Sequence, residues 1–206
     1  MHRLAVLLSG RGSNFEAIAD AVEAGRIPDA EIVAVISDVA GARGLERARE
    51  RGLPAFAVER GRFSSRAEHE REIGRILRDA GTDLVCLAGY MRILSPEFVR
   101  EWPGRILNIH PSLLPKYRGL SPQRRALEAG DVEAGCSVHV VDEGTDTGPV
   151  VLQRKVPVEP NDTEETLSAR ILEREHEAYP EAIVKVLDGL ETPRKNAPES
   201  VHRPRR

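Results

Sequence analysis

The sequence predicts a single α/β domain built on an open, twisted, mixed and mostly parallel sheet, with helices on both faces. Its 206 residues are enough to form one well-buried core, but they are rather few for two such cores. Short, continuous apolar runs that end in glycine or polar residues indicate parallel strands buried on both faces. Four runs have this form: "RLAVLLSG" (3–10), "EIVAVISD" (31–38), "DLVCLAGY" (83–90) and "RILNIHP" (105–111).

Helical segments fall between the first three of these runs. "NFEAIADAVEAG" (14–25) and "RAEHEREIGRILRDAG" (66–81) carry apolar residues at helical spacing, and each closes on glycine, which commonly ends helices. The first ninety residues therefore predict strand, helix, strand, helix and strand, as in an open parallel sheet.

The pattern changes after residue 119. Two β-rich segments, 136–144 and 149–158, are joined by the acidic turn "DEGTDTGP" (142–149), and they predict paired strands that extend the sheet. A final helix is predicted from Asp162, whose side chain is placed to cap it. Residues 1–190 are thus expected to form the domain, and the proline-rich, charged residues 191–206 a surface tail.

Composition and charge exclude several classes of function. The formal net charge is −3 and no basic stripe alternates with aromatic residues, which argues against a nucleic-acid binder and favours a small-molecule partner. Cys86 and Cys136 belong to no metal-ligand cluster and are expected to be buried free thiols. The apolar run 4–8 is too short for a signal peptide or a membrane span, so we expect a cytoplasmic protein with no membrane partner.

Ligands of open parallel sheets bind beyond the carboxyl ends of the strands, so the residues after each run are the candidates. After the first run, backbone N–H groups and a helix dipole favour an anion such as a phosphate. The residues at this turn are Gly10, Gly12, Ser13 and Asn14. A dinucleotide is disfavoured, because Phe15 occupies the third glycine position of G-x-G-x-x-G. The structural alternative is a capping box formed by Ser13 and Glu16.

After the fourth run, period-two spacing sends Asn108 and His110 to the same side of a strand end. An imidazole can move a proton near neutral pH, and a carboxamide N–H can stabilise an oxyanion, so the pair suits acyl transfer without a covalent intermediate. Asp146, in the acidic turn, would orient the ring and favour its charged form if it reaches it. A capped strand end with a structural histidine is the alternative.

Glu175 is a second unusual position. It interrupts an apolar row on the final helix, and a carboxylate on a buried side needs a partner. The row consists of Leu167, Ile171, Tyr179, Ile183 and Leu187. An arginine that forms a structural salt bridge with Glu175 would be one such partner.

Four stretches, in this order and with this spacing, resemble the glycinamide ribonucleotide formyltransferases of purine biosynthesis. They are "SGRGSN" (9–14), "LAGYMRILS" (87–95), "NIHPSLLPKYRG" (108–119) and "DTGPVVLQ" (146–153). The resemblance covers about residues 4 to 190 and implies a Rossmann-like formyltransferase fold. It implies transfer of a formyl group from the co-substrate 10-formyltetrahydrofolate to the amino group of N1-(5-phospho-D-ribosyl)glycinamide (glycinamide ribonucleotide), without a metal.

The resemblance also implies residue roles. Asn108 and His110 would stabilise the tetrahedral oxyanion, His110 would handle the proton, and Asp146 would tune His110. The nucleotide would contact Gly12, Ser13 and Asn14 with its phosphate, and Glu175 with its amino and ribose end. The folate would contact Arg66, Met91, Arg92, Ile93, Leu94 and Asn108. Without the resemblance, residues 91–94 would be core packing and Arg66 a solvated helix start.

One loop departs from the family pattern, and rival functions stay open. Ser121, Pro122 and Gln123 stand where several relatives carry histidines, and this loop leans toward methionyl-tRNA formyltransferases. Such an enzyme, a formyltetrahydrofolate hydrolase and a non-catalytic nucleotide-binding module are the alternatives. The first two would be expected to carry an additional domain, and the hydrolases a second histidine where this chain has Pro111. The sequence does not determine the oligomeric state, and a homodimer stays open.

Overall fold

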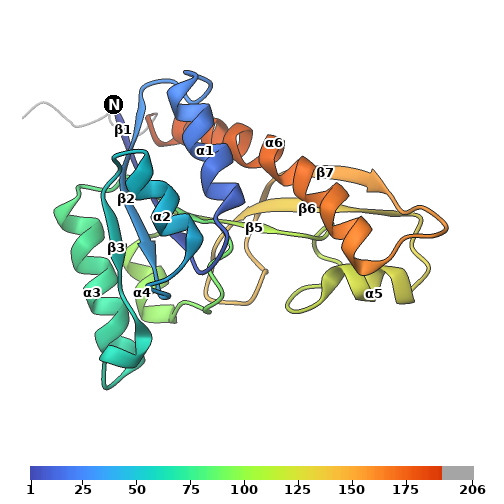
Figure 1. Ribbon diagram of the computed structural model, residues 1–206, viewed down its shortest axis with the longest axis horizontal. Helices are drawn as coiled ribbons and strands as arrows, with labels where there is room; N and C mark the ends of the chain where they lie inside the picture. The colour runs from blue at the N-terminus through green and yellow to red at the C-terminus, as the bar shows by residue number, and fades with distance from the viewer. Residues whose placement is uncertain (192–206) are drawn as a thin grey trace, which may run out of the picture.

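The computed structural model describes residues 1–191, which form one seven-stranded sheet with the strand order β3-β2-β1-β4-β5-β6-β7 (Figure 1). The strands are β1 (His2–Leu8), β2 (Ala30–Ser37), β3 (Ala55–Ala57), β4 (Leu84–Leu87), β5 (Ile106–His110), β6 (Glu133–Val140) and β7 (Val150–Pro157). The first five are parallel, and β6 and β7 continue the sheet antiparallel. The predicted mixed, mostly parallel sheet is confirmed. The tail predicted for 191–206 falls outside the described residues, apart from Glu191 at the end of the last helix.

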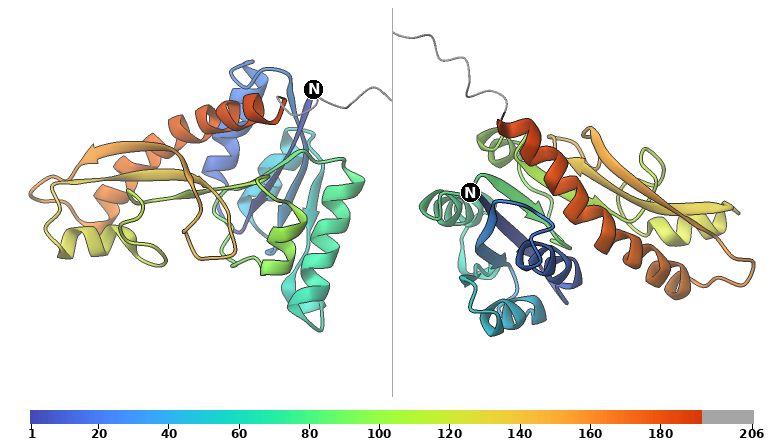
Figure 2. Two further views of the ribbon diagram at one scale, coloured as in Figure 1. Left: turned by 180° about the vertical axis from the view of Figure 1, so that it is seen from behind. Right: turned by 90° about the horizontal axis from the view of Figure 1, so that it is seen from above.

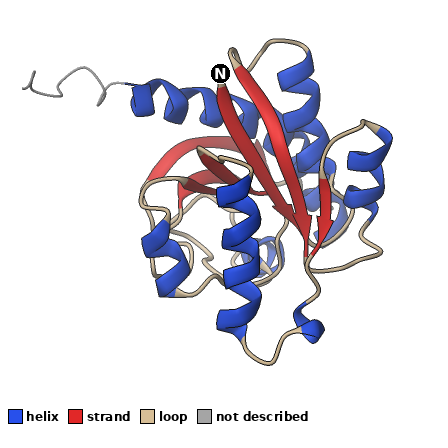
Figure 3. Ribbon diagram, turned by 90° about the vertical axis from the view of Figure 1, so that its left-hand side faces the viewer, coloured by secondary structure: helices blue, strands red, loops and turns tan. Residues whose placement is uncertain are grey.

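Helices cover both faces of the sheet, as predicted (Figure 3). They are α1 (Ser13–Glu23), α2 (Arg43–Glu50), α3 (Arg66–Asp79), α4 (Pro96–Glu101), α5 (Pro122–Glu128) and α6 (Glu164–Glu191), with a 3₁₀ turn η1 (Arg60–Arg62). One core cluster packs α1, α2 and α6 on one face, and a second packs α3 and α4 on the other. None of the helices in residues 1–191 combines the length and the apolar character that a membrane crossing requires.

Burial on both faces explains the continuous apolar runs. In β1, Leu4, Val6 and Leu8 join the first core cluster, while Ala5 and Leu7 join the second. Successive side chains of a strand point to opposite faces, so a central strand with helices on both sides is apolar at every position. Cys86 and Cys136 are buried free thiols, as expected, and burial raises the pKa of Cys136 to about 12.

The antiparallel half holds the strands predicted around the acidic turn. β5 pairs with β6 so that Asn108 stands opposite His139, and β6 pairs with β7. α6 lies along β6 and β7 (Figure 2). The fully buried Tyr179 of α6 places its hydroxyl 3.0 Å from the carbonyl oxygens of Leu87 and of Leu107, which fixes the helix over β4 and β5.

The start of α6 corrects a prediction. The helix begins at Glu164, and Thr163 caps it by accepting a hydrogen bond from the backbone N–H of Thr166 (3.3 Å). Asp162, the predicted cap, lies one residue too early and instead pairs with Arg170 (2.6 Å). The sequence interpretation also missed α2, β3, α4 and α5, each of eight residues or fewer, because such short segments show too little periodicity.

Candidate active site

The candidate site lies where the carboxyl ends of β1, β4 and β5 meet the turn between β6 and β7. The parallel strands β1, β4 and β5 are neighbours, so the residues that follow them collect at one edge. The β6–β7 turn starts beside the beginning of β5 and reaches the other end of that strand through Asp146. The segments are the β1–α1 turn (residues 9–14), the β4–α4 loop (88–95), the β5–α5 loop (111–121) and the β6–β7 turn (141–149). The sequence interpretation had selected this edge as the ligand site.

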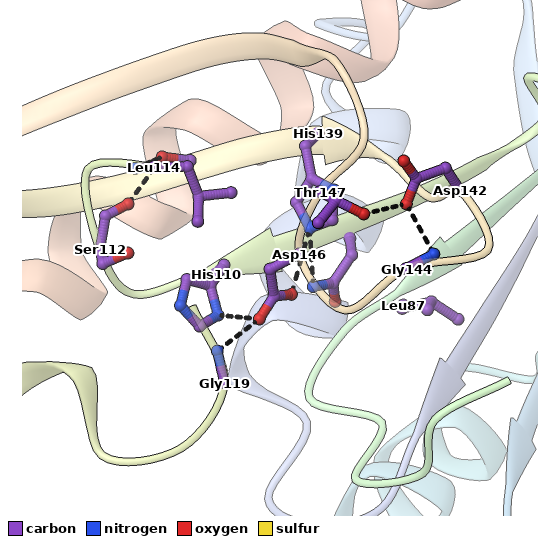
Figure 4. A network of polar contacts seen from close by, with 12 residues as sticks. Leu87, His110, Ser112, Leu114, Gly119, His139, Asp142, Gly144, Asp146 and Thr147 are labelled. Atoms are coloured by element: carbon purple, nitrogen blue, oxygen red, sulfur yellow. Dashed lines mark hydrogen bonds and ion pairs between the residues drawn. The ribbon is translucent and has the colours of Figure 1, made fainter. Parts of the chain in front are cut away.

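His110 and Asp146 meet although they lie on different segments (Figure 4). The Nδ1 atom of His110, the last residue of β5, is 3.4 Å from Oδ2 of Asp146, and the backbone N–H of Gly119 donates to the same oxygen (2.9 Å). Asp146 has a φ of 53°, in the left-handed region that aspartate tolerates better than most residues. This local backbone turns its carboxylate toward the end of β5.

Opposing effects set the protonation of Asp146. Burial raises its pKa, but hydrogen bonds from His139 and from the Gly119 N–H, together with the nearby histidine rings, outweigh burial and hold the pKa below its usual value. The group is therefore a carboxylate at neutral pH. The other ring nitrogen of His110, Nε2, lies 2.9 Å from the carbonyl oxygen of Tyr117. Both neighbours of the ring are acceptors, so hydrogen bonds to both require a proton on each nitrogen.

His139 is a site residue that the sequence interpretation did not nominate. Its ring is 2% exposed, and Nε2 lies 3.1 Å from the amide nitrogen of Asn108 and 3.5 Å from Oδ1 of Asp146. Nδ1 faces the Val140 carbonyl oxygen (3.1 Å), so the ring is held against its own strand while Nε2 contacts both the Asn108 carboxamide and the Asp146 carboxylate. The signal in the sequence that could have drawn attention to His139 was the alternation in "CSVHVVDEG", but only the β5–β6 register places His139 opposite Asn108.

The β1–α1 turn has the form expected of an anion site. Gly12 is the N-cap of α1 with a φ of 78° and no side-chain cap, so the capping-box alternative is wrong and Ser13 is the first helical residue. The first intrahelical hydrogen bond runs from Glu16 N to Gly12 O, which leaves the N–H groups of residues 13–15 without helical acceptors. A Cβ on Gly12 would lie 2.6 Å from Cα of Gly44, so both the backbone angle and the close approach require glycine.

Asn14 and Glu175 form a buried pair between α1 and α6. Nδ2 of Asn14 donates to Oε2 of Glu175 (2.7 Å), and burial raises the pKa of Glu175, which this hydrogen bond only partly offsets. Oδ1 of Asn14 is buried without a hydrogen-bonding partner among the described residues. The alternative of a salt bridge from Glu175 to an arginine is not supported, since within residues 1–191 the Glu175 carboxylate accepts its hydrogen bond from the Asn14 amide.

The β4–α4 loop exposes apolar side chains instead of burying them. Met91 is 77% and Ile93 68% exposed, although Leu94 is buried, so core packing explains only one end of the segment. Arg92 pairs with Asp38 (2.6 Å). Arg66, at the start of α3, donates to Glu70 (2.9 Å) and to the carbonyl of Ile93 (2.5 Å), so it is not simply a solvated helix start.

A cavity of about 430 Å³ lies beside this loop between α3 and α4. Its lining includes Arg66, Glu70, Arg71, Ser95 and Phe98. Glu97 and Glu101 line it as well, so the two arginines face three carboxylates and the lining carries no excess of positive charge. In residues 1–191, no group of three or more His, Cys, Asp or Glu side chains is arranged to hold a metal ion.

The divergent residues Ser121, Pro122 and Gln123 lie at the start of α5. Ser121 is its N-cap with a φ of 51°, and Pro122 is its first residue. Gly119, two residues earlier, is the donor to Asp146. This loop therefore borders the group that contacts His110.

Comparisons with known proteins agree with this geometry. The chain is 49% identical over 204 residues to the trifunctional purine biosynthetic protein adenosine-3 of Drosophila pseudoobscura pseudoobscura. The matched region covers 97% of this chain but only 15% of that protein. It is 48% identical over 189 residues to the phosphoribosylglycinamide formyltransferase of Haemophilus influenzae, covering 92% of this chain and 89% of that protein. The crystal structure of glycinamide ribonucleotide transformylase 1 from Symbiobacterium toebii matches with a TM-score of 0.89 and 49% identity, covering 92% of this chain and 89% of that one.

The family model described as formyl transferase matches residues 2–183. That range includes all four stretches on which the sequence resemblance rests, as well as Glu175 on α6. The resemblance to glycinamide ribonucleotide formyltransferases is confirmed by the names of these relatives. This chain belongs to the formyl transferase family.

Proposed function

We propose that this protein transfers the formyl group of 10-formyltetrahydrofolate to the amino group of glycinamide ribonucleotide, in de novo purine biosynthesis. The observation that carries the proposal is the convergence of Asn108, His110 and Asp146 at one end of the sheet, in a chain of the formyl transferase family. A carboxamide N–H, an imidazole and a carboxylate are the groups that an acyl transfer without covalent catalysis needs. We propose residues 1–190 as the domain that performs it.

The reaction proceeds through a tetrahedral intermediate. The neutral amine attacks the formyl carbon, so that a C–N bond forms and the carbonyl oxygen becomes an oxyanion. Asn108 and the protonated ring of His110 donate hydrogen bonds to that oxygen. The bond to folate N10 then breaks as a proton passes from the attacking nitrogen to N10, which leaves tetrahydrofolate and the N-formyl product. Asp146 orients His110 and stabilises its positive charge.

The geometry assigns different tasks to the two nitrogens of His110. Nδ1 faces Asp146, so Nε2 is the atom that meets the reacting groups. In the free protein Nε2 contacts the Tyr117 carbonyl, and the bound substrates take the place of that acceptor. His139 keeps the Asn108 carboxamide in position during this exchange.

Each substrate has its own segment. The nucleotide phosphate binds the β1–α1 turn at Gly12, Ser13 and Asn14, where the first N–H groups of α1 have no helical acceptors, and Glu175 receives the amino and ribose end. The folate ring binds along residues 91–94, where exposed Met91 and Ile93 offer apolar contact and Arg66 and Arg92 fix the loop. The cytoplasmic location stays a prediction.

A direct assay tests the proposal. The folate absorbance is followed with 10-formyltetrahydrofolate and glycinamide ribonucleotide, then with the nucleotide omitted, and then with methionyl-tRNA in its place. We expect turnover only with the nucleotide, and none with His110→Ala. Equal turnover without the nucleotide would instead indicate a hydrolase, and formylation of methionyl-tRNA a tRNA formyltransferase. Absence of any turnover, with folate and nucleotide both bound, would contradict the proposed reaction.

A further inference from the structure

Ser9 connects the two segments that bind the two substrates in the proposed function. It is the last residue before Gly10 in the β1–α1 turn. Its backbone N–H donates to the Gly89 carbonyl (3.0 Å), and its hydroxyl accepts a hydrogen bond from the Met91 N–H (2.9 Å). One side chain of the turn at the nucleotide end therefore holds the backbone of the β4–α4 loop.

A buried carboxylate fixes this connection. The Ser9 hydroxyl donates to Oδ1 of Asp38 (2.5 Å), and Oδ2 of Asp38 accepts from Nε of Arg92 (2.6 Å). The Asp38 side chain is 5% exposed and follows β2, the strand next to β1. A buried charge is strongly destabilising unless it is paired and hydrogen-bonded, so Asp38 holds its two partners in a fixed relation.

The far end of the β4–α4 loop has a separate anchor. The buried Glu70 accepts from the backbone N–H of Ser95 (2.9 Å) and from its hydroxyl, and it pairs with Arg66. Within residues 1–191, the hydrogen bonds and the ion pair of Glu70 are with Arg66 and Ser95, and none of them reaches the β1–α1 turn. Two buried carboxylates thus hold one loop, but only Asp38 ties it to the other segment.

We propose that Ser9 and Asp38 are positioning residues that couple the binding of the nucleotide to the binding of the folate. This inference rests on the proposed function. A nucleotide on the β1–α1 turn stabilises the arrangement of Ser9 that these hydrogen bonds define, and through the Ser9 hydroxyl and Asp38 it stabilises Met91 and Arg92 in the same arrangement, so the folate meets a loop that opens less often. Thermodynamic linkage requires the same factor in the reverse direction. Neither Ser9 nor Asp38 contacts the reacting atoms.

Calorimetry measures this coupling without turnover, because tetrahydrofolate carries no formyl group. The Kd of glycinamide ribonucleotide is measured alone and with saturating tetrahydrofolate, and the Kd of tetrahydrofolate with and without the nucleotide. In the parent protein we expect each ligand to lower the Kd of the other by about fivefold or more, and by the same factor in both directions. In Ser9→Ala the factor should fall below about twofold, and Ser9→Thr, which keeps a hydroxyl, should retain it.

Two further variants separate coupling from damage to the loop. Asp38→Asn keeps one acceptor oxygen for two donors, so its coupling factor should lie between those of the parent and Ser9→Ala. Glu70→Gln, the matched control, should weaken tetrahydrofolate binding and leave the coupling factor unchanged. Thermal melts of all variants report whether the fold is retained.

The outcomes are distinct. A parent that binds both ligands with a coupling factor near one, or a Ser9→Ala protein that keeps the parent's factor while binding both ligands more weakly, would overturn the coupling and leave the proposed function intact. A parent that binds neither ligand would overturn the proposed function, and the coupling with it. If Ser9→Ala does not fold, the comparison of Asp38→Asn with Glu70→Gln decides, because equal coupling factors in the two would refute the inference.

Discussion

Asp146 in the β6–β7 turn and Glu175 on α6 are both removed from water, yet their pKa values shift in opposite directions. Burial raises the pKa of both groups. At Asp146 a backbone N–H and two histidine rings outweigh burial, whereas at Glu175 a single amide from Asn14 does not. The number and charge of the donors, and not burial alone, decide the direction in which each pKa is shifted. The two regions therefore suit different tasks: a fixed anion beside His110, and a carboxyl beside the β1–α1 turn whose contact is the neutral amide of Asn14.

The largest effect should follow from removing the charge at Asp146. We expect Asp146→Asn to lower kcat by about 10²- to 10⁴-fold, because His110 loses the anion that orients its ring. The affinity for folate should change little. Steady-state kinetics with both substrates measures the two parameters.

Asp142 provides a matched control in the same turn. It is exposed and accepts from Gly144 N (3.1 Å) and Thr147 Oγ1 (2.6 Å) without contacting His110 (Figure 4). Asp142→Asn should stay close to the parent. Loss of proton handling should lower kcat by far more than about threefold. If Asp146→Asn keeps its kcat within about threefold of the parent, Asp146 therefore has only a turn-forming role.

A smaller effect is expected at Glu175. Glu175→Gln keeps the size of the side chain and an acceptor for Asn14, but removes the charge that a ligand would meet. We expect roughly 10- to 100-fold weaker binding of glycinamide ribonucleotide, as for the loss of one hydrogen bond to a charged group, and unchanged binding of tetrahydrofolate. Calorimetry measures both.

Glu177, an exposed residue of the same helix that pairs with Arg174, is the control for this change. Glu177→Gln should bind both ligands as the parent does. Equal losses for nucleotide and folate in Glu175→Gln would mean that the helix as a whole has moved, and would remove Glu175 from the nucleotide site.

Asn14, the partner of Glu175, lies in the first turn of α1, and the conformation of the chain before this helix depends on Gly12. Gly12→Ala adds a Cβ that meets Cα of Gly44 at a residue with positive φ, so we expect a loss of about 1–3 kcal/mol in the free energy of unfolding. Gly10→Ala is the matched control, since its Cβ would meet no atom within 4 Å. Urea unfolding compares the two, and equal stability would show that the close contact with Gly44 is not required.

The smallest effect is the pH dependence of stability, and its sign differs between the two carboxyls. The pKa of Asp146 is lowered, so its contribution is present above its ordinary pKa and is lost as the pH falls through the folded value. The pKa of Glu175 is raised, so its contribution is fully present below its ordinary pKa and is lost as the pH rises through the folded value.

Urea unfolding between about pH 3 and pH 8 tests these signs. Relative to the parent, Asp146→Asn should lose stability mainly at the neutral end of this range. Glu175→Gln should instead gain relative stability toward the neutral end, because its amide does not ionise. The same slope of stability against pH in both variants would contradict the opposite shifts.

Much of the fold was predictable because burial on both faces leaves a local signature. A central strand such as β1 is apolar at every position, and the helices between such strands have their own period. The spacing of Asn108 and His110 likewise placed them on one side of a strand end, where ligands of parallel sheets bind. The glycines between the first strand and the first helix likewise predicted a turn at the N-terminus of a helix, and Gly12 forms the N-cap of α1.

The sequence by itself therefore determined the class of fold, the edge of the sheet that carries the candidate site, and two of its central side chains. Only the tertiary structure decided their partners. It placed His139 opposite Asn108 through the β5–β6 register, and it brought Asp146 to His110 through a left-handed turn. It also joined Ser9 to Met91 through the order of neighbouring strands. Periodicity reports which face of an element is buried, whereas contacts between distant segments depend on strand order, register and turn conformation, which no short stretch of sequence contains.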